Sequence, residues 1–405
     1  MFLRSLQLAN YRNFRRLALT LEDGPTVIEA QNAQGKTNLL EAIELLSTTK
    51  SSRAGTDREL IHWSVLGGKE NGVSELEAFG RINAVVGQER GDTRAEVILR
   101  VIEGDNGAAP AVSKAFRING LPRRALEFVG EINVVSFSPE DVSLVDGSPS
   151  GRRRYLDIMN SQMSSRYLRS LQRYGKVLAQ RNSLLRHSRE SGRLDPSLSV
   201  WDEELASNGA FLFQERARSV SELAVYADGW FKELGGWGQH LDIRYRPGLP
   251  DDEAAALRAA PGAIDERLGL IHAAFIHALA TVSAKERIVG MSLVGPHRDD
   301  LSFIADGVDL NVFGSRGQQR LAALSLKLAQ LDLLRKTNGT RPILLLDDVL
   351  SELDDVKQAA VLRVAASGGQ TLLTVTSPDT ARSALPDATV LHLEAGSIDM
   401  ARRSV

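Results

Sequence analysis

Apolar and polar residues alternate near the start of the chain. Leu17, Leu19 and Leu21 face one way, with Ala18 and Thr20 between them, which predicts a half-buried strand. A second short strand is predicted at residues 26–29. Residues 38–46 have the composition and the spacing of a helix. The pattern therefore predicts a strand, a loop and a helix in succession.

The next region favours antiparallel strands. Residues 73–120 predict a meander, in which 96–102 and 115–118 are strand-like. Asn119-Gly120 is a typical turn sequence.

From about residue 151 to residue 288 the pattern becomes helical. A stretch rich in glycine and proline, 235–262, interrupts it, and 264–288 resumes it. The first part carries apolar residues every three or four positions: Leu156, Met159, Met163, Tyr167, Leu171, Tyr174 and Leu178. After Gly295 the pattern predicts a helix over about 318–334 and strands at 343–346, 372–376 and 390–393.

Composition narrows the class of protein only modestly. The 405 residues include 43% hydrophobic and 25% charged residues, which is ordinary for a soluble globular protein. There is no cysteine, which excludes disulfides and thiolate sites and suits a reducing cytosol. No apolar run approaches the ~20 residues that span a bilayer, and the N-terminus has no signal-peptide pattern. The net charge is −2, so any nucleic-acid surface must be local.

The predicted strand–loop–helix unit contains a phosphate-loop motif. Lys36 would reach the β- and γ-phosphates, and Thr37 would bind Mg²⁺. Ala30 stands where the motif usually has glycine, which is acceptable if its φ is negative. Arg12 is a further candidate for a nucleotide contact from the first strand, and simple surface exposure explains it equally well. The candidate ATP-binding residues of the loop are Ala30, Gln31, Asn32, Ala33, Gln34, Gly35, Lys36, Thr37 and Asn38.

A second candidate site lies more than 300 residues later. Residues 344–346 are apolar and end in Asp347 and Asp348, which predicts a buried strand with acids at its carboxyl end. Asp347 would hold Mg²⁺ through water, and Asp348 would orient or deprotonate the attacking water. The separation of the two motifs predicts a large insertion between them.

A segment about 30 residues before this strand resembles the signature of the ATP-binding-cassette superfamily. Ser315, Gly317 and Gln318 match that signature, and Ser351 to Asp354 match its D-loop. The resemblance implies that the signature of one subunit contacts the γ-phosphate held by another. It also places Glu140 and Asp141 at the Q-loop, and Thr376 and Ser377 at the switch position. A proline-led turn explains Glu140 and Asp141 equally well.

Six stretches together resemble the RecF family of bacterial recombination-mediator ATPases. The family resemblance implies ATP and Mg²⁺ as cofactors, slow and DNA-stimulated hydrolysis, and an ATP-dependent homodimer. It implies binding to duplex DNA, gapped DNA and double-strand/single-strand junctions, with RecO and RecR as partners. It also implies recombinase loading, a link to the SOS response, and a cytoplasmic, nucleoid-associated protein without a membrane. The stretches are residues 10–14, 35–43, 137–141, 152–157, 295–301 and 347–354.

The expected fold is α/β: a two-lobed ABC-type ATPase head with a mixed sheet, an antiparallel β subdomain and an inserted helical arm. The predicted domains are 1–150, with the phosphate loop and the antiparallel sheet, 151–290, the helical insertion, and 291–405, with the signature and the acidic strand.

Basic residues in the insertion suggest a DNA surface. Four of them share one helical face, and two precede the same predicted helix. Such a face could follow a phosphate backbone, although the solvated side of an amphipathic helix explains it equally well. The candidates are Arg152, Arg153, Arg166, Arg169, Arg173 and Lys176.

Other classes fit the sequence less well. A transporter subunit would carry its motifs closer together, a Rad50-like head would need long heptad repeats, and a small-molecule kinase would lack residues 315–320. A clamp that binds ATP without hydrolysing it remains open. The sequence assigns no role to His297 or Arg298.

Overall fold

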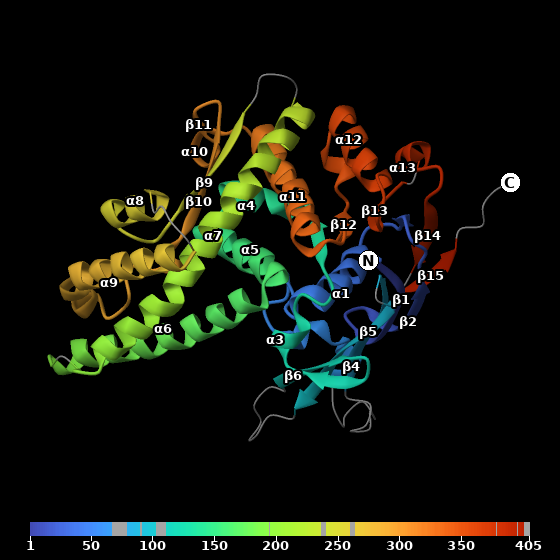
Figure 1. Cartoon of the computed structure of the whole chain (residues 1–405). Helices are drawn as coiled ribbons and strands as arrows, with labels where there is room; N and C mark the ends of the chain where they lie inside the picture. The colour runs from blue at the N-terminus through green and yellow to red at the C-terminus, as the bar shows by residue number, and fades with distance from the viewer. Residues whose placement is uncertain are drawn as a thin grey trace. The chain divides into compact units, whose positions relative to one another are not determined.

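The computed structural model describes residues 1–66, 79–89, 91–102, 111–193, 195–235, 240–259, 264–377, 379–394 and 396–400. The chain forms two compact units (Figure 1). One unit joins Met1–Glu140 with Gln330–Val405, and the other is Asp141–Ala329. The two ends of the chain therefore fold together around the insertion, as the separated motifs predicted.

A parallel sheet is the centre of the first unit. Its strand order is β15-β14-β3-β13-β12-β8, and only β15 is antiparallel to its neighbour. Every residue of β12 and β13 is buried, as in strands covered on both faces. The strands are β3 (Pro25–Glu29), β8 (Val134–Phe137), β12 (Ile343–Asp347), β13 (Thr371–Val375), β14 (Thr389–Glu394) and β15 (Ser397–Met400). The helices are α1 (Lys36–Thr48), α12 (Asp355–Ala366) and α13 (Asp379–Ala384).

An antiparallel sheet completes the first unit, in the order β2-β1-β4-β5-β6-β7. Its strands are β1 (Phe2–Tyr11), β2 (Phe14–Thr20), β4 (Phe79–Gln88), β5 (Gly91–Ile102), β6 (Ala111–Ile118) and β7 (Leu121–Arg123). The predicted meander is confirmed over β4, β5 and β6, while residues 73–78 and 103–110 lie outside the described part. Asn119 and Gly120 both have positive φ and turn β6 into β7. Short helices α2 (Trp63–Leu66) and α3 (Ala125–Phe128) lie between these strands in the sequence.

One hydrophobic core joins the two sheets and α1. Leu17 and Leu19 of β2 are buried in it, which confirms the predicted alternation. The buried amide of Gln370 also ties the sheets together. Its oxygen accepts the Leu3 N–H at 2.7 Å, and its nitrogen donates to the carbonyls of Leu3 at 2.9 Å and Glu22 at 3.1 Å.

The second unit is mostly helical. Its helices are α4 (Ser143–Asp146), α5 (Pro149–Met163), α6 (Ser165–Ser191), α7 (Leu198–Gly235), α8 (Asp251–Ala259), α9 (Ile264–Val289) and α10 (Leu310–Phe313). A small sheet pairs β9 (Leu241–Arg246), β10 (Asp300–Ala305) and β11 (Val308–Asp309). α11 (Arg316–Asn338) begins in this unit and ends in the first.

The apolar stripe that predicted a helix after residue 151 is divided between α5 and α6. Ser164 separates them, and its hydroxyl accepts the Tyr167 N–H at 3.2 Å as the N-cap of α6. Arg152 and Arg153 therefore lie in α5, a separate helix that precedes α6, the helix of the basic stripe.

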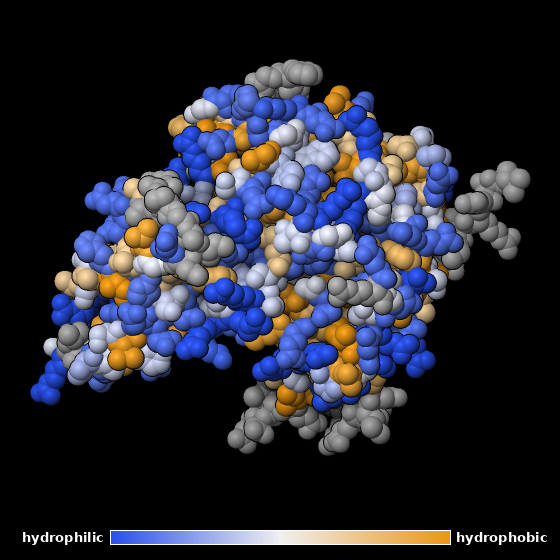
Figure 2. Space-filling view, viewed as in Figure 1, coloured by the Kyte–Doolittle hydropathy of each residue, from blue (hydrophilic) through white to orange (hydrophobic). Residues whose placement is uncertain are grey.

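α9 is long and apolar enough to cross a membrane by length and composition alone. Its inward residues, including Phe275 and Leu279, belong to the buried core of the second unit. Its Glu286 is also buried and forms an ion pair with Arg181 at 2.7 Å. Figure 2 shows hydrophobic patches mixed with hydrophilic residues over α6 and α9. These features are those of a helix that packs one face on the core of a globular unit; 22% of its apolar stretch is buried.

Candidate functional site: a phosphate loop facing an acidic strand

The phosphate loop connects β3 to α1, as predicted. Gly35 has a φ of 102°, and a Cβ at this position would lie 2.4 Å from the Asn13 side chain. Only glycine fits both constraints. Ala30 is absent from the residues with positive φ, so alanine replaces the usual glycine without strain. The Lys36 amino group donates to the Ala30 carbonyl at 2.9 Å and so lies across the mouth of the loop.

Asn13 supports the loop from the turn after β1. Its amide donates to the Gln34 carbonyl at 3.2 Å and accepts from the Asn38 amide at 2.8 Å. Sequence reasoning missed Asn13 and considered its neighbour Arg12.

Arg12 makes a different contact. Its guanidinium donates to both carboxylate oxygens of buried Glu41, at 2.6 and 2.7 Å. The hydroxyls of Tyr11 and Ser51 donate to the same carboxylate. Burial opposes ionisation of Glu41, but the hydrogen bonds from Arg12 and Ser51 outweigh it and hold its pKa below the usual value. Arg12 therefore anchors α1, and a nucleotide contact by Arg12 stays a prediction.

Asp347 and Asp348 lie at the carboxyl end of β12, as predicted. Thr374, directly opposite Asp347 on β13, holds both residues. Its hydroxyl donates to the Asp347 carboxylate at 2.8 Å and accepts the Asp348 N–H at 2.9 Å. Asp348 has a left-handed φ of 52°. Sequence reasoning missed Thr374, because β13 also begins with a threonine and no local pattern separates the two.

The surroundings of Asp348 favour the protonated form of its carboxyl group. Partial burial raises its pKa; the Lys36 ammonium opposes this effect, and the carboxylates of Asp347 and Glu352 add to it. A carboxylate with a raised pKa accepts a proton from water more readily than an ordinary aspartate does.

Arg53 lies between two carboxylates of the site. It contacts Glu140 at 3.2 Å and Asp347 at 3.6 Å. Of the two residues predicted at the Q-loop, Glu140 is therefore linked to the acidic strand. Asp141 belongs to the second unit, where it pairs with Lys327 at 2.9 Å.

The D-loop and switch residues surround the same strand ends. The Ser351 hydroxyl donates to the Asp348 carbonyl at 2.8 Å. Asp354 caps α12 and accepts the Lys357 N–H at 3.0 Å. Thr376 and Ser377 are exposed just beyond β13, whose last residue, Val375, accepts the Ala30 N–H at 3.1 Å. The two predicted switch residues thus come directly after the strand that lies beside the phosphate loop.

The residues fit a magnesium–nucleotide complex. Within the described ranges, no group of three or more His, Asp or Glu side chains could hold a metal alone. Mg²⁺ typically binds one or two protein oxygens together with phosphates and water. Thr37 at the start of α1 and Asp347 would supply those oxygens.

The signature segment lies in the second unit and opens α11 as predicted. Ser315 is its N-cap: the Gln318 N–H donates to the Ser315 hydroxyl at 3.3 Å, and the Gln318 side chain accepts the Ser315 N–H at 2.9 Å. Gly317 has no positive φ, and a Cβ there would meet only the Ser315 hydroxyl, at 4.0 Å. Nothing within the described chain therefore requires glycine at this exposed position.

The four predicted basic residues of α6, Arg166, Arg169, Arg173 and Lys176, are all exposed. Arg166 lies 4.4 Å from the centre of the Phe211 ring, and Arg173 pairs with Glu204 at 3.0 Å. Arg169 and Lys176 share this exposed face.

Arg152 and Arg153 of α5 differ from the exposed stripe. Arg152 is only 4% exposed and forms a two-pronged ion pair with Asp300 at 2.5 and 3.0 Å. A DNA contact by Arg152 does not fit this burial, and we remove it from the candidates. Arg153 is half-buried and donates to the Asp299 carbonyl at 2.8 Å.

The sequence left open the roles of His297 and Arg298, which lie in the second unit, where His297 is half-buried and Arg298 is exposed. The Tyr174 hydroxyl lies 2.7 Å from the His297 ring, and burial lowers the pKa of His297 to about 4. Arg298 donates to the Ser292 carbonyl at 3.0 Å. A neutral, half-buried histidine that contacts Tyr174 indicates a structural role here.

Comparison with known proteins agrees with this geometry. The family model for the RecF/RecN/SMC N-terminal domain matches residues 2–391. A "DNA replication and repair protein RecF" of Chloroflexus aurantiacus is 43% identical over 382 residues, 93% of each chain. The RecF of Herpetosiphon aurantiacus is 39% identical over 406 residues, covering 98% of this chain and 99% of its own.

Solved structures show the same relationship. The recombination mediator protein RecF with ATP has a TM-score of 0.82 and 30% identity, and the match covers 99% of this chain and 97% of that one. The Smc head domain of Pyrococcus furiosus shares the fold at a TM-score of 0.52 and 14% identity. The fold and the site thus define an α/β ATPase head of the ABC and SMC class. Within this class, the chain belongs to the RecF family.

Proposed function

We propose that this protein is an ATP-dependent DNA-binding protein of DNA replication and recombinational repair. One observation carries the proposal: Lys36, Asp347 and the base-like Asp348 share one unit, although they are more than 300 residues apart. RecF relatives named for DNA replication and repair, and RecF solved with ATP, support it.

ATP would bind with its phosphates at the N-terminus of α1, where backbone N–H groups favour anions. Lys36 would exchange the Ala30 carbonyl for a phosphate oxygen. Thr37 and Asp347 would hold Mg²⁺, and the metal would supply neutralisation of phosphate charge. Asp348 would orient or deprotonate the attacking water. Its side chain is shorter than glutamate, which would slow hydrolysis and suit a switch.

A second copy of the chain would complete the site. Ser315 and Gly317 are exposed, and Gly317 has no reason within its own chain to be glycine. A glycine here would let the γ-phosphate of an ATP molecule held by a partner chain come close to the backbone. Val312 and Phe313, which lie just before Gly314 and Ser315, also suit an interface, since they are 65% and 76% exposed.

DNA would bind the basic face of α6, where Arg166, Arg169, Arg173 and Lys176 are exposed. By family resemblance, the DNA would be duplex, gapped or a junction, and RecO and RecR would be partners in recombinase loading and the SOS response. The protein would act in the cytoplasm at the nucleoid. Hydrolysis would release the dimer and would be stimulated by DNA.

The substitution Lys36→Ala tests this proposal. We expect it to abolish ATP-dependent dimerisation and DNA binding together, because both would depend on the same bound phosphates. Sedimentation and fluorescence anisotropy with ATP, ADP and no nucleotide would measure the two effects. Full ATP-dependent dimerisation by this variant would refute the proposed function. A dimer without turnover in the unaltered protein would instead favour the non-hydrolysing clamp.

A further inference from the structure

The outer face of the antiparallel sheet is strongly basic. Alternate residues of its strands point away from the core, because the residues between them are buried. Two carboxylates share the face: Asp92, paired with Arg4 at 3.1 Å, and Glu96, which lies between two arginines. The arginines on this face, beyond Arg4, are Arg16, Arg81, Arg94, Arg100 and Arg117.

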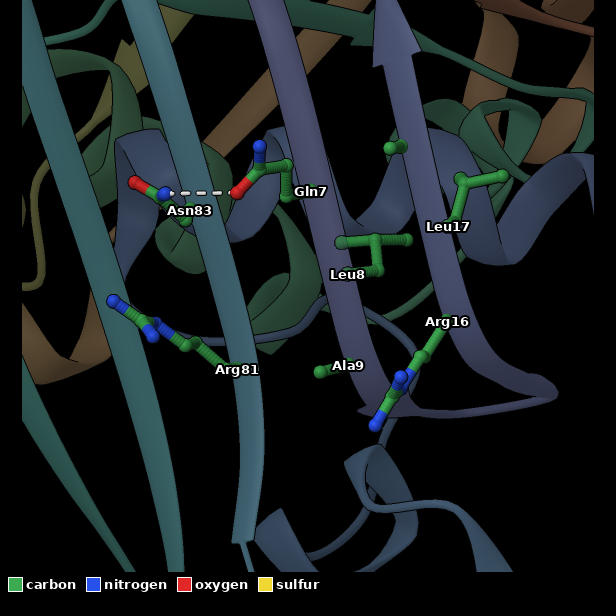
Figure 3. Close-up of a pocket in the computed structure, with 8 residues that line it drawn as sticks. Gln7, Leu8, Ala9, Arg16, Leu17, Arg81 and Asn83 are labelled. Carbon is green, nitrogen blue, oxygen red and sulfur yellow. Dashed lines mark hydrogen bonds between the residues drawn. The ribbon is translucent and has the colours of Figure 1, made fainter.

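A depression of about 340 Å³ lies on this face (Figure 3). Ala9 is directly opposite Arg16 on one side and Arg81 on the other. The two arginines are therefore two strands apart, roughly 10 Å between their Cα atoms. Ala9 and Ala18 leave the space open between the guanidinium groups.

The two arginines differ in their partners. Arg81 pairs with Glu96, which is only 6% exposed and also contacts Arg117 at 3.6 Å. Arg16 is exposed and has no ion pair with any residue that the structure describes. Arg81 is thus held in place by its ion pair, whereas the Arg16 side chain can change its conformation around a ligand.

The remaining lining residues add two more recognition elements. Ala9 and Ala18 give the depression an apolar floor. At its other end, the Asn83 amide donates to the Gln7 side chain at 3.2 Å, and such amides can also bond a peptide backbone. Figure 3 shows this pair beside the floor.

We propose that this depression docks an acidic segment of another protein, in which a carboxylate adjoins an apolar side chain. Guanidinium groups bind carboxylates with two parallel hydrogen bonds, and the alanine floor would cover the apolar side chain. A DNA backbone fits less well, because it offers no apolar group to this floor and Glu96 would repel its phosphates. The site lies outside the ATP motifs and does not depend on the function proposed above.

The test uses the full chain and three fluorescein-labelled ten-residue peptides. One alternates Asp with Leu, one replaces Leu with Ser, and one replaces Asp with Asn. We expect the Asp/Leu peptide to bind most tightly. Arg16→Glu should weaken it by about tenfold or more, since the substitution removes one ion pair and adds a like charge. This variant leaves the Arg81–Glu96 pair intact, and thermal unfolding would verify its fold.

Arg15→Glu is the matched control. Arg15 is also exposed and adjoins Arg16 on β2, but its side chain points to the opposite face. Binding by this variant should change less than about twofold, because its side chain lies on the opposite face of the sheet and is separated from the peptide by a solvent-screened distance. Ala18→Glu should weaken binding as Arg16→Glu does. The proposal is wrong if no peptide binds, if both arginine variants lose affinity equally, or if a 30-base-pair duplex displaces the peptide and loses affinity with Arg16→Glu.

Discussion

At the scale of single residues, the sequence identified the groups that would perform the chemistry and missed those that hold them. Lys36, Asp347 and Asp348 stand in local motifs, so their spacing reveals them. Thr374 and Arg53 become recognisable only once their segments meet the acidic strand in the fold. No local pattern distinguishes a supporting threonine from an ordinary strand residue.

The first prediction concerns Asp348. Replacing it with Asn should reduce ATP turnover by about 10²–10⁴-fold, the usual contribution of a general base. Nucleotide affinity should change little, because the phosphates would be bound by Lys36 and the loop. Steady-state turnover and titration with a fluorescent ATP analogue would separate the two effects. Unchanged turnover would remove Asp348 from the mechanism.

The pH dependence of ATP turnover provides a second test of the role of Asp348. A base acts in its deprotonated form, and the pKa of Asp348 is raised. Turnover at saturating ATP should therefore fall as the pH decreases through that raised pKa, starting at a higher pH than for an ordinary aspartate. This acid limb should disappear from the residual activity of Asp348→Asn.

At the scale of elements, long periodic patterns predicted helices correctly. They did not predict where one helix ends and the next begins. The predicted helix after the phosphate loop is α1, but the apolar stripe after residue 151 continues across the break between α5 and α6. Ser164 ends one helix and caps the next without disturbing the spacing. Sequence periodicity alone could not reveal such a break, and it gave no sign that Arg152, which we expected at a DNA surface, is buried.

The basic face of α6 yields an element-scale prediction. Arg169→Glu should weaken DNA binding and reduce the slope of log affinity against log salt by roughly one, as expected for one lost phosphate contact. Arg186→Glu reverses an equally exposed charge on another face of the same helix and should have little effect. Titration of duplex and gapped DNA at several salt concentrations would measure both. Equal effects of the two variants would mean that the basic face of α6 is exposed to solvent and does not contact DNA.

At the scale of the whole molecule, the separated motifs correctly predicted an insertion. The predicted division at residues 150 and 290 remains a prediction, and the compact second unit extends to Ala329, which includes the signature. The central claim concerns more than one chain. Lys36 would act on an ATP molecule that Ser315 of another copy completes.

A mixing experiment tests that claim most directly. Lys36→Ala lacks a working phosphate loop, and Ser315→Arg lacks a working signature, so each variant alone should form no active dimer. A mixture can form heterodimers in which the loop of one chain faces the intact signature of the other. We predict that mixing restores ATP turnover, up to one active site per heterodimer, together with ATP-dependent dimerisation. Turnover by Ser315→Arg alone would contradict the composite site. So would no recovery of turnover on mixing, once both variants have been shown to be folded and their ATP binding has been measured.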